Sequence, residues 1–132
     1  TYRLQRRKGV DLRAARSQVP YLARLGISHL YLSPVFAARE GSTHGYDVVD
    51  PGRLDPALGG ERDLAGLARA AERHGMALLL DVVPNHMAAS PQSPAFADVL
   101  AHGPASRCAP WFDVDWGEMK KIWEIQLPED VF

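Results

Sequence analysis

The sequence predicts an α/β fold in which parallel strands alternate with helices. Three short segments have the composition and length of strands, and the two segments between them repeat apolar residues every three or four positions, as amphipathic helices do. A strand, helix, strand, helix, strand order is typical of right-handed βαβ units around a parallel sheet. The 132 residues, of which 46% are hydrophobic and 23% charged, have the balance of a globular chain that can bury a core.

The first strand and the first helix are predicted within the opening 25 residues. Residues 1–5 alternate in side-chain character over β-favouring residues, which indicates a short strand. Asp11 can cap a helix that continues to Leu25, and Gly26 supplies the stop. Pro20 lies inside this span, so we expect either a kink or a shifted start of the helix.

The remaining strands and the second helix follow a similar logic. Residues 27–32 form a short apolar run, which is typical of a strand covered on both faces. Residues 34–60 hold many Gly, Pro and Asp with little periodicity, so we expect a long loop, and loops of that length are usually functional. A helix begins at Glu61 and ends before Gly75, and the apolar run 76–83 predicts a buried parallel strand.

Regularity fades after the third predicted strand. Residues 94–102 favour a short helix, and the rest is rich in aromatic residues without a clear period. The sequence contains no internal repeat and no low-complexity segment.

Composition argues against several classes of partner. The net charge of −1 gives no field that attracts nucleic acid or anionic lipid, and the short run Arg6, Arg7, Lys8 is typical of a solvated turn. Cys108 is the only cysteine, which excludes an internal disulfide and a cysteine-based zinc site. No apolar run has the roughly 18 residues of a membrane span, and the first residues lack the order of a signal peptide. We therefore expect a cytoplasmic protein with a neutral ligand.

Polar side chains follow two of the predicted strands. In parallel α/β folds the loops at the C-terminal ends of the strands converge, and ligands bind there. Residues 41–50 place an imidazole, a phenol ring and carboxylates in one glycine-hinged loop, and residues 81–86 place a carboxylate, an amide and an imidazole after the third strand. A neutral sugar is bound by an aromatic ring stacked on its C–H face and by hydrogen bonds to its hydroxyls. The residues that supply this chemistry are His44, Tyr46, Asp81, Asn85 and His86.

The residue types alone leave a structural alternative open. Asp81 can instead anchor a loop, and His86 can cap local backbone carbonyls. We expect structural or solvent-exposed roles for His29, His74 and His102.

Two segments resemble signature motifs of the α-amylase superfamily. The segment from Asp81 to His86, Asp-Val-Val-Pro-Asn-His, matches the first signature segment, and His44-Gly45-Tyr46 with Asp50 is similar to the upstream motif after barrel strand two. The narrower resemblance is to the maltooligosyltrehalose synthase family. That resemblance runs from residue 1 to residue 116 and is carried by residues 1–5, 30–34, 41–50 and 112–116.

This resemblance implies a partial (β/α)8 TIM barrel, because a complete one needs roughly 250 residues. Residues 1–86 would form the N-terminal part of the catalytic barrel. Residues 87–132 would hold the start of the insertion after strand three and a tail that diverges from the family beyond residue 116. The open edges of a three-stranded parallel sheet lack pairing partners, so we expect self-association.

The resemblance also implies a reaction. Such synthases convert the reducing-end α-1,4 bond of a maltooligosaccharide into an α,α-1,1 bond by intramolecular transglucosylation, without a cofactor, on the retaining path of two carboxyl groups. Those carboxyl groups belong to later strands of the family, so the chain is expected to hold no catalytic residue and to be inert alone. By family position, Tyr46 would stack on the glucose, and His44 and His86 would hydrogen-bond its hydroxyls.

The remaining motif residues would have supporting roles by the same resemblance. Asp81 would orient its polar neighbours, and Asp50 would brace its loop. Asn85 corresponds to a calcium-site residue of many amylases, but one amide is far short of the roughly six oxygens that calcium needs, so no metal is expected. Two alternatives stay open: another hydrolase or transglycosylase of the superfamily, or a non-catalytic sugar-binding module. A Rossmann-type nucleotide binder is disfavoured, because no G-x-G-x-x-G follows the first strand.

Overall fold

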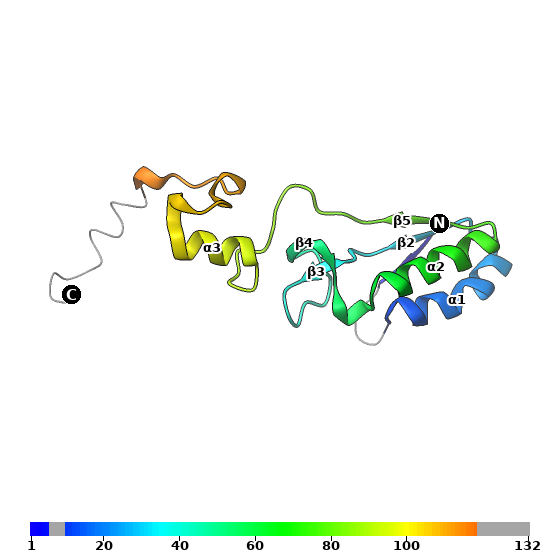
Figure 1. Ribbon diagram of the computed structural model, residues 1–132. Coiled ribbons are helices and arrows are strands. Elements are labelled where there is room, and N and C mark those ends of the chain that lie inside the picture. The colour runs from blue at the N-terminus through cyan, green and yellow to red at the C-terminus, as the bar shows by residue number, and fades with distance from the viewer. Residues whose placement is uncertain (6–9, 119–132) are drawn as a thin grey trace. The chain divides into compact units, whose positions relative to one another are not determined.

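The computed structural model describes residues 1–5 and 10–118, and the chain forms two compact units, divided between Ser93 and Pro94 (Figure 1). The first unit contains a parallel sheet in the order β1-β2-β5, which confirms the predicted parallel βαβ arrangement. Its strands are β1 (Tyr2–Leu4), β2 (His29–Leu32) and β5 (Ala77–Leu80). Its two α-helices are α1 (Leu12–Arg24) and α2 (Glu61–Arg73).

Both helices begin and end where the sequence predicts. The Asp11 carboxylate accepts a hydrogen bond from the Ala14 backbone N–H at 2.7 Å, which caps the start of α1. Gly26 follows the end of α1 with a φ of 78°, a left-handed conformation that glycine adopts without steric cost. Pro20 lies within α1 and does not end it.

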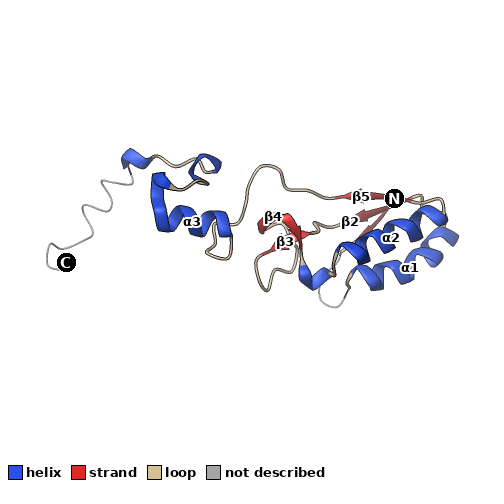
Figure 2. Ribbon diagram, in the orientation of Figure 1, coloured by secondary structure: helices blue, strands red, loops and turns tan. Residues whose placement is uncertain are grey.

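One face of the sheet packs against both helices (Figure 2). Leu30 and Leu32 of β2 are fully buried, whereas the intervening Tyr31 is only half-buried. Because successive side chains of a strand point to opposite faces, the helices cover the face that carries the leucines. The helix residues in this core are Leu12, Ala15, Val19, Leu22, Leu67, Ala70 and Ala71.

The prediction that strands two and three are buried on both faces was wrong. In β5, the side chains of Leu79 and Leu80 are 45% and 46% exposed. Within the described residues β5 is an edge strand, and helices cover only one face of the sheet, so its apolar run lies partly open to solvent. The apolar run therefore predicted the strand β5 correctly, but it did not predict which faces of that strand are covered.

The predicted long loop of residues 34–60 contains regular structure, which corrects the prediction that it has none. An antiparallel pair forms from β3 (Phe36–Ala38) and β4 (Val48–Leu54), and a short 3-10 helix follows at Pro56–Leu58. The strands escaped prediction because β3 is only three residues long and the pairing shifts register twice along it. In addition, β4 contains Pro51 and Gly52, which break the alternation typical of a strand.

The second unit begins with α3 (Pro94–His102), which confirms the predicted short helix. Two single 3-10 turns follow, at Gly103–Ala105 and Ala109–Trp111. The rings of Phe96 and Phe112 lie 5.7 Å apart. The tail that is expected to diverge from the family begins after residue 116, and its residues from 119 onward lie outside the described part of the chain.

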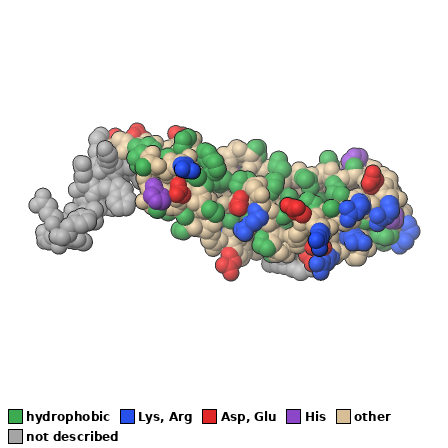
Figure 3. Space-filling model, in the orientation of Figure 1, with side chains coloured by type: hydrophobic (Ala, Val, Ile, Leu, Met, Phe, Trp, Pro, Cys, Tyr) green, Lys and Arg blue, Asp and Glu red, His purple; other side chains and the backbone are tan. Residues whose placement is uncertain are grey.

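The surface carries charges of both signs. Figure 3 shows basic side chains over the part of the first unit formed by α1 and α2, with acidic side chains among them. The Arg13 guanidinium of α1 donates a hydrogen bond to the Asp63 carboxylate of α2 at 2.9 Å. No helix in the described part of the chain is long and apolar enough to span a membrane.

The exposed edge of β5 generates a prediction. We expect the chain to self-associate as its concentration rises, because an edge strand with exposed apolar side chains can pair with another copy. Leu80→Lys should shift the equilibrium toward monomer, since a charge on an edge strand disfavours pairing. Leu25→Lys serves as the control, because Leu25 is 56% exposed at the end of α1 and lies on no strand. Sedimentation velocity at several concentrations measures this, and equal association of both variants and the parent chain would contradict it.

Candidate functional site

The Asp81 carboxylate joins two tyrosine hydroxyls at the C-terminal end of the sheet. Its Oδ2 accepts a hydrogen bond from the Tyr31 hydroxyl at 2.8 Å and one from the Tyr46 hydroxyl at 2.5 Å. The Asp81 backbone N–H donates to the Leu32 carbonyl at 3.0 Å, so the residue is fixed to the end of β2 as well. Tyr31 lies on β2 and Tyr46 on the loop between β3 and β4. One carboxylate thus ties that loop to the sheet.

Arg3 of β1 completes this cluster. Its Nη2 donates a hydrogen bond to the Tyr46 hydroxyl oxygen at 3.0 Å, and its guanidinium carbon lies 5.5 Å from the centre of the Tyr31 ring. The sheet register places Arg3 beside Tyr31 and Tyr31 beside Leu79. These three residues, and Asp81 two positions after Leu79, belong to the face of the sheet that points away from the helix core.

The electrostatics of the cluster keep both phenols protonated. The hydrogen bond to Asp81 raises the pKa of Tyr46 above its ordinary value, and burial and the negative charge of Asp81 add to the increase. The same causes, in the same order, raise the pKa of Tyr31. The positive charge of Arg3 acts in the opposite direction on both phenols. At neutral pH the two hydroxyls therefore remain donors to a carboxylate, which is a charge-assisted and strong arrangement.

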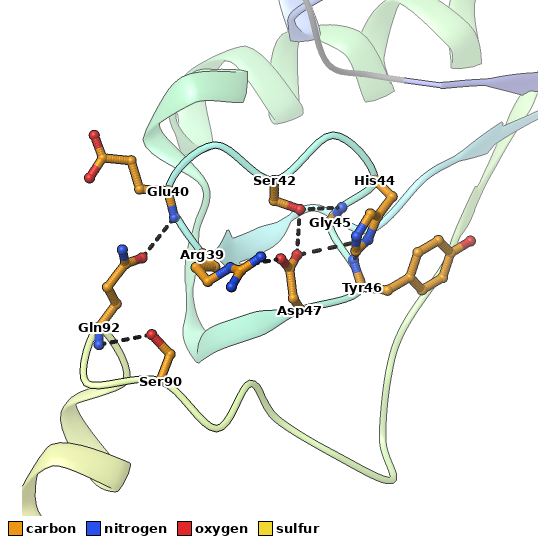
Figure 4. Close-up of polar contacts among 9 residues, drawn as sticks. All are labelled: Arg39, Glu40, Ser42, His44, Gly45, Tyr46, Asp47, Ser90 and Gln92. Atoms are coloured by element: carbon orange, nitrogen blue, oxygen red, sulfur yellow. Dashed lines mark hydrogen bonds and ion pairs between the residues drawn. The ribbon is translucent and has the colours of Figure 1, made fainter.

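The loop that carries Tyr46 is held by its own hydrogen bonds (Figure 4). The Ser42 hydroxyl donates to the Asp47 carboxylate and accepts from the Gly45 backbone N–H at 3.0 Å. Gly45 has a φ of 84°, where a side chain would be strained, so the glycine between His44 and Tyr46 is required by the backbone. Figure 4 shows the Tyr46 ring pointing away from these bonds.

Asp47 remains ionised within this loop. Burial raises the pKa of Asp47, but the hydrogen bond from Ser42, a backbone hydrogen bond, the His44 imidazole in its protonated form and the Arg39 guanidinium together lower the pKa below its ordinary value. The Arg39 Nε lies 3.5 Å from the Asp47 Oδ2. These contacts fix the backbone on both sides of Tyr46.

The geometry of His44 leaves one ring nitrogen available. Its Nδ1 accepts a hydrogen bond from the Tyr46 backbone N–H at 3.0 Å, so in the neutral imidazole the proton resides on Nε2. The His44 and Tyr46 rings are stacked, with centroids 5.9 Å apart and planes inclined by 24°. The His44 side chain is half exposed. A donor N–H and an aromatic face are therefore presented side by side.

The structure places His86 in the loop that follows β5, where its ring contacts the Asn85 side chain. The His86 Nδ1 donates to the Asn85 Oδ1 at 3.1 Å, which leaves Nε2 as an acceptor in the neutral ring. Both side chains are exposed. The segment after β5 is tied to the hairpin, because the Ala88 N–H donates to the Val48 carbonyl at 2.8 Å. A second tie joins the Glu40 N–H to the Gln92 Oε1 at 2.7 Å (Figure 4).

The Asp50 side chain contacts residues of its own strand, β4. Its Oδ1 accepts a hydrogen bond from the Gly52 N–H at 2.9 Å, and its Oδ2 lies 3.7 Å from the Arg53 Nε. These contacts hold the backbone of β4 at its Pro-Gly step and do not reach the Asp81 cluster.

Sequence reasoning missed Arg3 and Tyr31 as members of the site. Of the predicted residues, the structure brings Tyr46, His44 and Asp81 together, and it places Asn85 and His86 beside each other on the next loop. The missed signal was the alternation along the strands. Once Leu30 and Leu32 are assigned to the core, Tyr31 must lie on the opposite face of the sheet. Asp81, at the end of the neighbouring strand, belongs to that same face.

Two other features do not belong to this site. A cavity of about 920 Å³ is lined by residues 37–43, together with Asp11, Asp55 and Gln92 among others, and neither Tyr46 nor Asp81 contributes to it. Within residues 1–5 and 10–118, no group of three or more His, Cys, Asp or Glu side chains is placed to hold a metal ion.

Comparison with known proteins gives similarity along most of the chain. A protein of Mycobacterium tuberculosis strain H37Rv, assigned as a maltooligosyl trehalose synthase, is 46% identical over 123 residues, which cover 88% of this chain and 16% of that protein. The solved structure of maltooligosyltrehalose synthase from Arthrobacter ramosus matches with a TM-score of 0.86 and 46% identity, over 90% of this chain and 16% of that one. Neopullulanase 2 of Thermoactinomyces vulgaris is 39% identical over 107 residues, which cover 81% of this chain and 18% of that protein.

The chain thus spans about one sixth of the length of the relatives it matches. The family model described as "Alpha amylase, catalytic domain" matches residues 5–130. This span includes the loop of Tyr46, the end of β5 with Asp81, and His86. The match extends over most of the sequence, and the chain belongs to the α-amylase family.

Proposed function

We propose that this chain forms the N-terminal part of the catalytic (β/α)8 barrel of a trehalose-forming transglucosylase. The whole enzyme would convert the reducing-end α-1,4 bond of a maltooligosaccharide into an α,α-1,1 bond. The observation that carries the sugar site is the Asp81 carboxylate bonded to the Tyr46 hydroxyl, which leaves the ring face of Tyr46 as the part that can contact a ligand. The choice of a synthase is supported by 46% identity to relatives of that description, against 39% to a neopullulanase.

The chain supplies binding groups to this reaction. The Tyr46 ring offers an apolar face to the C–H face of a glucose, and the His44 Nε2–H lies beside it as a donor to a hydroxyl. The His86 Nε2, on the adjacent loop, offers an acceptor. Aromatic stacking fixes the plane of the sugar, and the two imidazoles fix its rotation in that plane. Such positioning is a large part of what an active site contributes to rate.

The remaining chemistry falls to segments outside this chain. On the retaining path a carboxylate attacks the anomeric carbon while a carboxylic acid protonates the leaving oxygen, and the resulting glycosyl-enzyme is then opened by an acceptor. In the proposed reaction the acceptor is the released glucose, through its anomeric hydroxyl, so no cofactor and no net water are consumed. Residues 1–86 would build the first three barrel strands with their helices, and residues 87–132 would begin the insertion after the third.

The proposed reaction can be tested on the enzyme expressed from the whole open reading frame that contains this chain. Purified enzyme incubated with maltopentaose should remove reducing ends without releasing glucose, because an α,α-1,1 bond joins two anomeric carbons. A reducing-sugar assay together with chromatography of the products measures both quantities. The isolated 132-residue chain should show no turnover. A gain of reducing ends would replace the proposed synthase with a hydrolase, and the absence of any reaction would favour a sugar-binding module.

The role of Tyr46 can be measured on the chain itself. Tyr46→Ala should weaken binding of maltopentaose by about tenfold or more, because the substitution removes an aromatic platform from the centre of the site. Isothermal titration calorimetry at high protein concentration gives the affinity. Tyr21→Ala is the matched control, since Tyr21 is 53% exposed on α1 and should leave binding unchanged. Equal affinity of the Tyr46 variant and the parent chain would argue against the proposed site.

A further inference from the structure

We propose that Arg3 and Tyr31 are positioning residues that set the orientation of the Tyr46 ring for its sugar. This inference rests on the proposed function of the site. Both residues lie outside the two α-amylase signature segments, within the stretches 1–5 and 30–34 of the narrower resemblance, and each reaches Tyr46 through a different contact. Arg3 donates to the Tyr46 hydroxyl oxygen directly, and Tyr31 shares the Asp81 oxygen to which Tyr46 donates.

The Tyr46 hydroxyl is restrained from two sides. Its proton is donated to the Asp81 Oδ2 at 2.5 Å, and its oxygen accepts from the Arg3 Nη2 at 3.0 Å. A phenol ring with its backbone fixed retains rotation about Cα–Cβ and Cβ–Cγ, and contacts at the hydroxyl remove the first of these, so they fix the direction in which the ring points. The oxygen lies on the Cβ–Cγ axis, so the plane of the ring is restrained only through the preference of phenol hydrogen bonds to lie near that plane. The hydroxyl is then occupied by protein groups, so a sugar meets the face of the ring.

The Asp81 carboxylate is itself held in place by a strand residue. Tyr31 donates to the same Oδ2 at 2.8 Å. It lies on β2, which pairs with β1 on one side and with β5 on the other. Without this donor the carboxylate keeps only the bond from Tyr46, so its orientation is less restrained, because Asp81 lies just beyond the last paired residue of β5. Tyr31 therefore acts on Tyr46 through Asp81.

The Arg3 guanidinium links the same two rings. It lies 5.5 Å from the centre of the Tyr31 ring while it donates to Tyr46, so one side chain of β1 contacts both tyrosines. An arginine suits this role better than a lysine, because its planar group can stack and donate at once. The three strands of the sheet thus each contribute a group that fixes the ring: Arg3 from β1, Tyr31 from β2 and Asp81 from the end of β5.

Substitutions that remove one contact test the inference on the full 132-residue chain. Arg3→Met keeps an unbranched, largely apolar stem but removes the guanidinium donor, and Tyr31→Phe keeps the ring but removes the hydroxyl. Each should weaken maltopentaose binding roughly three- to tenfold, the value of one hydrogen bond. The matched controls are Arg24→Met and Tyr21→Phe on α1, which should bind as the parent chain does.

A double-mutant cycle separates positioning from direct contact with the sugar. If Arg3 acts through the Tyr46 hydroxyl, Arg3→Met should add almost nothing in a Tyr46→Phe background, because that hydroxyl is already gone. Additive losses would mean that Arg3 touches the sugar itself, and would overturn a positioning role. The Tyr46 phenol gives a second readout by carbon-13 NMR. Loss of the Arg3 charge should raise the pKa of Tyr46 further, since that charge lowers it in the parent chain.

The outcomes distinguish this inference from the proposed function. If Tyr46→Ala loses affinity while Arg3→Met and Tyr31→Phe bind normally, the sugar site stands and the positioning role is refuted. If the parent chain itself does not bind maltopentaose, the proposed site falls and the inference falls with it. Circular dichroism of each variant confirms that the changes in affinity arise in a folded chain.

Discussion

The Asp81 carboxylate is the contact on which the site depends, because it connects the hairpin loop to the sheet through the Tyr46 and Tyr31 hydroxyls. A charge at the end of an apolar strand costs free energy unless it is hydrogen-bonded. Here two phenols and a backbone ladder bond hold the residue, and the phenols gain a fixed orientation in return. These hydrogen bonds offset the cost of placing a carboxylate there, and they also restrict the positions of the aromatic groups around it.

The leucine core determines which residues can join that carboxylate. Leu30 and Leu32 are fully buried against α1 and α2, which fixes the face of β2 that points to the helices. A register slip of one residue would move Tyr31 into that core and place a leucine beside Asp81. Packing on one face of the sheet therefore specifies the polar cluster on the other face. Stability of the first unit and geometry of the site are linked through strand register.

Features carried by local sequence could be predicted. Both helices follow from apolar spacing, with Asp11 and Gly26 at the two ends of α1, and the strand-end rule selected Tyr46 and Asp81. Features that depend on pairing between distant segments could not. The strands of the hairpin are short and irregular, and Leu79 is exposed because, among the described residues, helices cover only the opposite face of the sheet. Arg3 reaches Tyr46, and Tyr31 reaches Asp81, only after three strands are aligned.

Aromatic carbon-13 NMR during a maltopentaose titration tests the central claim most directly, because it reports on each tyrosine and histidine ring separately. If Tyr46, His44 and His86 surround one glucose, their ring signals should shift together and fit a single dissociation constant. The signals of His29, His74 and His102 should stay unchanged. Shifts that fit different constants, or a Tyr46 ring that does not respond while other rings do, would contradict the account.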